Sequence, residues 1–164
     1  MQKPKTILIA LGFSEYSKGI FEYGIMLAEA LDADILIANI INSRDVDTVD
    51  VITTMGYDVD GEHYLADVRK ARQKILDDFM KEASYPLERM RSLFRVGNPI
   101  DELLKIILTE KVDMIVMGTK GRTDLAHVLI GSVAEKVFRR SPVPVVSFRD
   151  EKTAEHMRQR IHIE

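Results

Sequence analysis

The chain has 164 residues, close to the usual length of one globular domain, and 46% of them are hydrophobic and 30% charged. This balance predicts a folded protein with a buried core under a charged surface. Because the formal charge is −3, the chain has no global positive field that would hold nucleic acid or an anionic membrane. It contains no cysteine, which excludes disulfides, thiolate metal sites and a cysteine nucleophile. No apolar run approaches the length of a membrane span, so we expect a cytoplasmic protein without membrane insertion.

In the first part of the chain, continuous apolar runs alternate with segments whose apolar residues recur at helical spacing. Residues 6–11 form a short continuous apolar run, which is typical of a parallel strand buried on both faces. Apolar residues at helical spacing predict a helix over about 15–31, with Ser14 as its cap, and a second buried strand spans 34–41. Residues 42–61 show no clear period, so we expect a segment that is either mobile or functional.

A long helix is predicted from residue 63 to the residue before Pro86, because apolar residues recur there every three or four positions. These positions are Tyr64, Val68, Ala71, Ile75 and Phe79. We expect this stripe to pack in the core rather than to contact a cofactor.

Strands and helices keep alternating in the rest of the chain. Asn98 is placed to cap a helix and Pro99 to occupy its first turn. The predicted elements are a strand within 87–96, a helix from 99 to about 110, a strand over 112–117, a helix over 132–140 and a strand over 143–148. The whole pattern predicts an α/β fold, a single Rossmann-like domain with a five-stranded parallel open sheet flanked by helices. Such sheets bind ligands beyond the carboxyl ends of their strands.

The segment 149–164 is strongly charged and lacks a sustained apolar stripe, so we expect a solvated tail or short helix after a domain of residues 1–148. His156 and His162 lie in this charged C-terminal tail. Their separation, without a framework of further ligands, is a poor metal motif, and we assign no metal ligand.

The segment 117–133 is rich in glycine and joins a predicted strand to a predicted helix. Its polar and flexible positions are Gly118, Lys120, Gly121, Arg122, Gly131 and Ser132. The first two glycines can adopt positive φ and let backbone amides approach an anion, and the Gly-Ser pair places free amides and a hydroxyl at a helix N-terminus. Each glycine alone is more typical of a turn and each cation alone of a solvated surface, but together they predict a phosphate site.

The spacing of these residues, Gly-x2-Gly-x9-Gly-Ser, resembles the nucleotide-binding motif of the universal stress protein family. The resemblance covers residues 4–148 and includes matches at 12–15, 96–99 and 141–146. It implies a fold like that of the adenine nucleotide alpha hydrolases, and a homodimer that pairs through the final strand, near 143–148. It also implies a stress-response or signalling module that binds ATP, ADP or AMP, with Mg²⁺ bridging the phosphates, and acts on an unidentified protein partner.

The resemblance assigns the nucleotide contacts position by position. Ala10, Leu11 and Gly12 would border the nucleoside, and Ile40 would border the adenine. Met117 and Gly118 would lie on the adenine or ribose side. The phosphates would be bound by Gly121, Gly131, Ser132 and Val133. Family members commonly have Asp where this chain has Gly12. The missing carboxylate would weaken binding by about 1.5–3 kcal/mol, because that is the usual contribution of a hydrogen bond to a charged group.

No enzyme motif accompanies the glycine-rich segment. The chain lacks the Walker arrangement, the Ser-Gly-Gly and paired-histidine signatures of enzymes on similar sheets, Gly-x-Ser-x-Gly and His-Glu-x-x-His. His127 is interpreted as a surface or packing residue, so no catalytic residue is assigned. The leading hypothesis is a module that works by nucleotide-dependent binding. A nucleotide-free dimerisation scaffold of the same fold and a slow ATPase are the alternatives.

Overall fold

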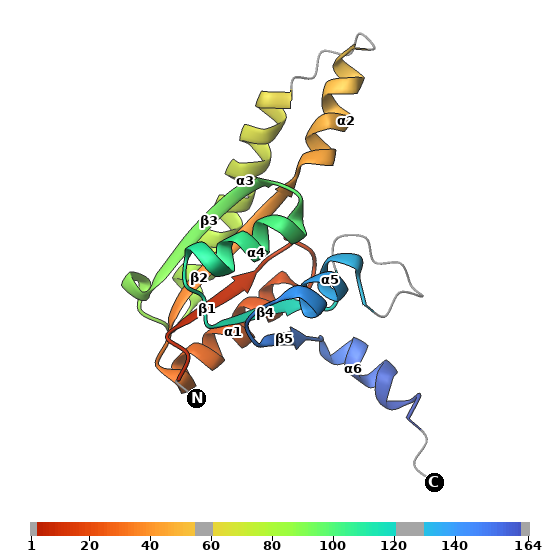
Figure 1. Cartoon of the computed structure of the whole chain (residues 1–164). Coiled ribbons are helices and arrows are strands. Elements are labelled where there is room, and N and C mark those ends of the chain that lie inside the picture. Colours follow the sequence, from red (N-terminus) through yellow and green to blue (C-terminus); the bar gives the residue numbers. More distant parts are fainter. Residues whose placement is uncertain (1–2, 55–60, 121–129, 162–164) are drawn as a thin grey trace.

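Five parallel strands form one open sheet in the order β3-β2-β1-β4-β5. The computed structural model describes residues 3–54, 61–120 and 130–161, and only the backbone of residues 51–54. The strands are β1 Thr6–Ala10, β2 Asp34–Asn42, β3 Met90–Gly97, β4 Met114–Gly118 and β5 Val145–Phe148. Figure 1 shows the sheet with helices on either side of it.

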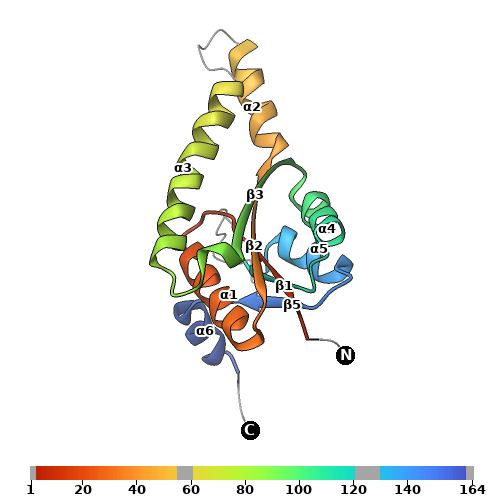
Figure 2. The same cartoon turned by 90° about the vertical axis from the view of Figure 1, so that its left-hand side faces the viewer.

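The helices cover both faces of the sheet (Figure 2). They are α1 Ser17–Leu31, α2 Ser43–Thr54, α3 Gly61–Glu82, α4 Pro99–Thr109, α5 Ser132–Arg140 and α6 Glu151–Arg158, with a 3₁₀ turn at Leu87–Arg89. Core residues of α1 and α3 pack on one face, and those of α4 and α5 on the other. The predicted single α/β domain with a five-stranded parallel sheet is therefore confirmed.

Strand β1 shows why the sheet is buried on both faces. Ile7 and Ile9 pack in the core cluster that contains Leu76 of α3, whereas Leu8 packs in the other cluster, with residues of α4. None of these three β1 side chains is exposed to solvent. Successive residues of a strand point to opposite faces, so a continuous apolar run is the pattern that two covered faces require.

Helix α1 begins later than the sequence predicts. Phe13 has a left-handed backbone, with φ of 53°, and the chain turns through Ser14 before the helix starts at Ser17 with Tyr16 as N-cap. The Ser14 hydroxyl accepts a hydrogen bond from the Tyr16 N–H at 3.4 Å, and the Ser17 hydroxyl accepts one from the Ser14 N–H at 3.0 Å. The prediction of Ser14 as the helix cap is wrong, because its side chain stabilises the preceding turn instead.

The core-facing stripe of α3 differs from the predicted stripe. Ala71 is exposed and Ile75 is 42% exposed, whereas Arg72 and Leu76 are buried. The Arg72 guanidinium donates to the side-chain oxygen of Asn39 in β2 at 2.8 Å. This contact holds α3 at a rotation that turns Ala71 and Ile75 outwards, so their predicted place in the core is wrong. The other predicted positions, Tyr64, Val68 and Phe79, are half-buried.

Two helices form where the sequence shows no apolar period. Helix α2 follows β2 directly, and Figure 1 shows α2 and part of α3 extending side by side beyond the sheet. Helix α6 forms in the charged C-terminal segment, where the Asp150 carboxylate accepts a hydrogen bond from the Thr153 N–H at 3.0 Å. The other predicted elements agree with the structure to within a few residues. In the described part of the chain, no helix has the length and apolar character that crossing a membrane requires.

Candidate functional site

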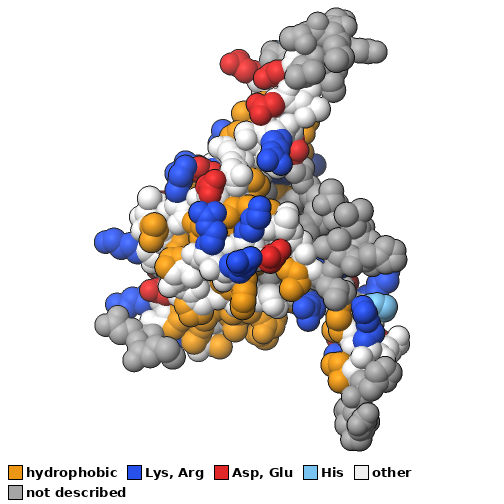
Figure 3. Space-filling view, turned by 45° about the vertical axis from the view of Figure 1, so that its right-hand side comes forward, with side chains coloured by type: hydrophobic (Ala, Val, Ile, Leu, Met, Phe, Trp, Pro, Cys, Tyr) orange, Lys and Arg blue, Asp and Glu red, His pale blue; other side chains and the backbone are white. Residues whose placement is uncertain are grey.

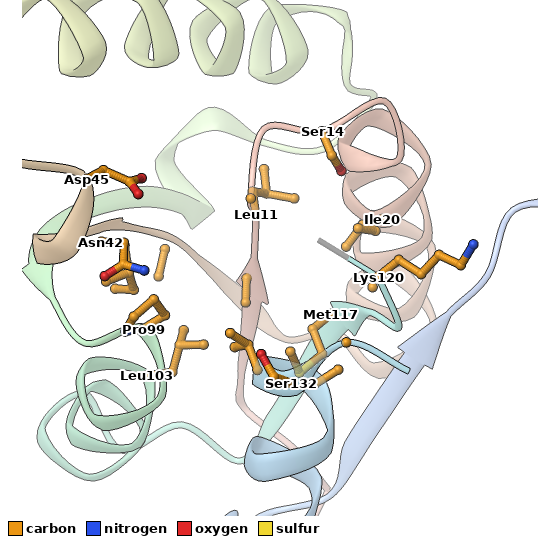
Figure 4. Close-up of a pocket in the computed structure, with 18 of the residues that line it drawn as sticks. Leu11, Ser14, Ile20, Asn42, Asp45, Pro99, Leu103, Met117, Lys120 and Ser132 are labelled. Carbon is orange, nitrogen blue, oxygen red and sulfur yellow. The ribbon is translucent and has the colours of Figure 1, made fainter. Parts of the chain in front are cut away.

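A pocket of about 750 Å³ lies at the carboxyl ends of β1, β2 and β4 (Figure 4). The chain order reverses at this place, because β1 has β2 on one side and β4 on the other. Open α/β sheets bind ligands where their strand order reverses, and the volume is in the usual range for small-molecule sites.

The loop after β1 forms one rim of the pocket. Ala10, Leu11 and Gly12 line it. The Leu11 carbonyl accepts a hydrogen bond from the side-chain amide of Asn39 at 2.6 Å, and Asn39 in turn accepts one from Arg72. Because both polar side chains are buried, this chain of hydrogen bonds fixes the rim relative to β2 and α3.

The loop after β4 and the start of α5 form the opposite rim. The Gly131 N–H donates to the Thr119 carbonyl at 2.7 Å, which brings the start of α5 next to the end of β4. Gly131 is the N-cap of α5, and because glycine has no side chain, it cannot cap the first-turn amides of this helix. The next residues, Ser132 and Val133, line the pocket, and Figure 4 shows the Ser132 hydroxyl pointing into it. The positive end of the α5 dipole therefore faces the pocket.

Gly118 is closely packed against α1 and the following turn. A Cβ added there would lie 2.8 Å from the Ile20 side chain and 3.2 Å from the Lys120 carbonyl oxygen. Its φ is not positive, so the left-handed backbone that a glycine permits is not used at this position. A side chain at this position would displace the end of the Ile20 side chain and crowd the Lys120 carbonyl, so the space favours glycine.

Lys120 lines the pocket through the stem of its side chain, and Figure 4 shows its ammonium group pointing away from the pocket centre. A different rotamer would be needed to bring this charge to a ligand. Two other predicted site residues, Gly121 and Arg122, lie outside the described residues, as does His127.

The structure brings all the described residues of the predicted site together around this pocket. They are Ala10, Leu11, Gly12, Ile40, Met117, Gly118, Lys120, Gly131, Ser132 and Val133. Contact between these residues and a ligand stays a prediction.

Sequence reasoning missed the wall of the pocket that comes from the end of β2 and from α2, α3 and α4. These lining residues are Asn42, Asp45, Thr48, Val49, Tyr64, Pro99 and Leu103. Asn42 is the last residue of β2 and Asp45 lies three residues further on, and that position in a parallel sheet is a signal that would have identified them. Across residues 3–54, 61–120 and 130–161, no group of three or more metal-binding side chains is placed to hold an ion.

The model of the universal stress protein family matches residues 3–149. The chain belongs to the universal stress protein family. The match spans the sheet and every element that lines the pocket.

Universal stress protein MJ0577 from Methanocaldococcus jannaschii is 25% identical over 150 residues, which cover 87% of this chain and 93% of that protein. Its solved structure superposes with a TM-score of 0.74 at 24% identity and covers 92% of this chain and 99% of that one. Two further solved structures were determined with nucleotides bound.

One is a universal stress protein in complex with cAMP, with a TM-score of 0.62, 20% identity, and coverage of 90% of this chain and 98% of that one. The other is the universal stress protein from Archaeoglobus fulgidus in complex with dAMP. It has a TM-score of 0.60 and 13% identity, and the match covers 90% of this chain and 100% of that one. At these identities, the similarity of the structures shows a shared fold.

Proposed function

We propose that this universal stress protein binds ATP or a closely related adenine nucleotide in the pocket at the carboxyl ends of β1, β2 and β4. The observation that carries the proposal is the junction of an apolar wall with the N-terminus of α5 in one pocket. Two proteins of the same fold were solved with cAMP and dAMP, which supports an adenine nucleotide as the ligand class.

The two parts of the pocket suit the two parts of a nucleotide. Leu11, Ile40, Met117 and Leu103 provide an apolar surface of the kind against which a planar base packs. At the other rim, the first-turn amides of α5 and the Ser132 hydroxyl provide donors for phosphate oxygens, and the helix dipole favours their negative charge. This arrangement needs no net positive charge on the protein.

Magnesium would be held mainly by the nucleotide. Among the described residues that line the pocket, Asp45 is the one carboxylate, and Figure 4 shows it across the pocket from Ser132. Mg²⁺ commonly binds through substrate phosphates and water with few protein ligands, and the residues present fit that mode. The ion would neutralise phosphate charge at the α5 rim.

The function would be binding rather than turnover. Nucleotide would order the rims of the pocket and change the affinity of the protein for a cytoplasmic partner, which requires different nucleotide affinities for two conformations. Slow ATP hydrolysis would be a side activity. Gly12 favours a second candidate, a scaffold that binds no nucleotide, because this pocket rim lacks the carboxylate that family members commonly have.

Isothermal titration calorimetry of ATP with Mg²⁺ tests the proposal. Gly131 has φ of −69° and ψ of 153°, which other residues adopt readily, so Gly131→Val places a side chain at the α5 rim without backbone strain. We expect wild-type protein to bind and Gly131→Val to lose binding while keeping its circular dichroism spectrum.

Two serine variants provide a matched comparison. Ser132→Ala should weaken binding several-fold, whereas Ser147→Ala, an exposed position on β5 outside the pocket, should bind like wild type. Absence of binding heat in wild-type protein purified free of nucleotide would favour the scaffold instead.

A further inference from the structure

One wall of the pocket has polar side chains that lie away from the α5 rim. Asn42 ends β2, and Asp45 lies in the first turn of α2; both line the pocket. Figure 4 shows them on the opposite side of the pocket from Ser132 and Lys120, with apolar side chains such as Leu103 and Met117 between the two groups. The pocket therefore has an anionic end and an anion-binding end.

Local hydrogen bonds join the residues next to Asp45 at this end of the pocket. The Asn42 side-chain oxygen accepts a hydrogen bond from the Arg44 N–H at 3.1 Å, which leaves its amide nitrogen as a donor. The Thr48 hydroxyl donates to the Arg44 carbonyl at 2.7 Å, one turn along the same helix. Asp45 lies in the first turn of α2, three residues after Asn42, so both side chains belong to the same end of the pocket.

The spacing of the strands sets the distance between the two ends. β2 and β4 lie on either side of β1, so their carboxyl ends are about 10 Å apart, two strand spacings. Along a nucleotide, the phosphates come first, then the sugar, and then the base. With the phosphates at the α5 rim, the edge of the base that is farthest from the phosphates lies toward β2 and α2.

We propose that Asp45 determines base specificity by accepting a hydrogen bond from the exocyclic amino group of adenine, while Asn42 donates to a neighbouring ring nitrogen. This inference rests on the proposed function, since it concerns the same pocket. A 6-oxo purine, as in ITP or GTP, presents a carbonyl oxygen at that position. Two acceptors cannot form a hydrogen bond with each other, and the carbonyl oxygen would be repelled by the Asp45 carboxylate, which disfavours these nucleotides.

The test compares ATP, ITP and 2′-deoxy-ATP by calorimetry against wild type, Asp45→Asn and Asp47→Asn. Asp47 lies on the same helix, is exposed and does not line the pocket, so its variant controls for the loss of one negative charge. We expect wild type to prefer ATP over ITP by about tenfold or more, the effect of one hydrogen bond to a charged group. The ratio should fall toward one in Asp45→Asn and stay unchanged in Asp47→Asn.

The 2′-deoxy-ATP arm separates base recognition from sugar recognition. If Asp45 contacts the base, Asp45→Asn weakens the binding of 2′-deoxy-ATP and the binding of ATP by the same factor. A loss confined to ATP would show that the carboxylate binds the 2′-hydroxyl and would overturn the inference. Tight ATP binding with an unchanged ATP/ITP ratio in Asp45→Asn would also overturn it and leave the proposed function standing. Absence of binding by every nucleotide to wild type would overturn both.

Discussion

Gly12 lies on the rim of the pocket at a place where the fold leaves room for a side chain. A Cβ added there would meet no atom within 4 Å, and the backbone φ is not positive. The glycine is therefore not required by the turn, and a residue with a side chain fits without moving the loop.

Gly12→Asp should therefore fold normally and strengthen ATP binding about tenfold, because the added carboxylate supplies a hydrogen bond of about 1.5–3 kcal/mol to the sugar or the metal. Calorimetry beside Gly12→Ala, which adds a side chain without charge, measures the gain. Equal affinities for Gly12→Asp and Gly12→Ala would mean that no ligand group lies at this rim.

Arg89 provides a prediction for pH dependence. Its guanidinium donates to the carboxylates of Asp32 and Asp34, at 2.7 Å each, and to the backbone carbonyl of Asp32 at 3.0 Å. The hydrogen bond from Arg89 lowers the pKa of Asp32 below its ordinary value. A carboxyl whose pKa is lower in the folded protein stabilises the fold above its unfolded pKa, and this stability is lost as the pH falls through the lowered value.

In Arg89→Gln, the pKa of Asp32 should return toward its ordinary value, as measured by NMR titration of the side-chain carboxyl. The free energy of unfolding of the variant should depend less on pH below about 4, the region of the unfolded pKa. An Asp32 titration that is identical in both proteins would contradict the assigned cause.

The elements of the sheet could be predicted because each strand is an uninterrupted apolar run. Helix α2 could not be predicted in the same way, and neither could the side of α3 that faces the core. α2 has few apolar positions, and its first turn is held by the Asn42 side chain, so no apolar period marks it. In α3, a buried arginine takes a core position that a count of apolar residues assigns to Ala71 or Ile75. A local hydrogen bond to Arg44 marks the start of α2, and a long-range one between Arg72 and Asn39 sets the core-facing side of α3.

The same limit applies to the pocket. The glycine-rich segment marks the rims from β4 and α5 because the proposed anion binding there would need particular residues at particular spacings. The α2 wall is made of ordinary polar residues, and only the position of Asn42 and Asp45 at and just after the end of β2 brings them to the pocket. Their role depends on strand order rather than on a local motif.

Arg72 joins α3 to the rim of the pocket, and its removal tests this connection. Arg72→Met should lower the free energy of unfolding by about 1–3 kcal/mol, because a buried hydrogen bond to Asn39 is lost and Asn39 also holds the Leu11 carbonyl. Arg69→Met, at an exposed position of the same helix, should change it by less than about 0.5 kcal/mol. Urea denaturation measures both variants. Equal stabilities would show that the Arg72 contact does not stabilise the fold.

At the scale of the whole molecule, β5 is one edge of the sheet. Figure 3 shows hydrophobic side chains gathered near the lower edge of the body, the side on which β5 lies in Figure 1. Phe138 of α5 is 71% exposed. An exposed edge strand is a place where a second copy of the chain could pair, so the homodimer through β5 stays a prediction.

Light scattering after size-exclusion chromatography should therefore give twice the mass of one chain at micromolar concentration, with or without ATP. A mass equal to one chain over the same concentration range would contradict the homodimer, and it would leave the pocket unaffected because all its described walls come from a single chain.

A crystal structure of the protein grown with ATP and Mg²⁺ tests the central claim most directly. We predict phosphate oxygens within hydrogen-bond distance of the Ser132 and Val133 amides, and the adenine against Ile40 with its amino group toward Asp45. Nucleotide bound elsewhere on the protein, or phosphates placed at the Asp45 end of the pocket, would contradict the account.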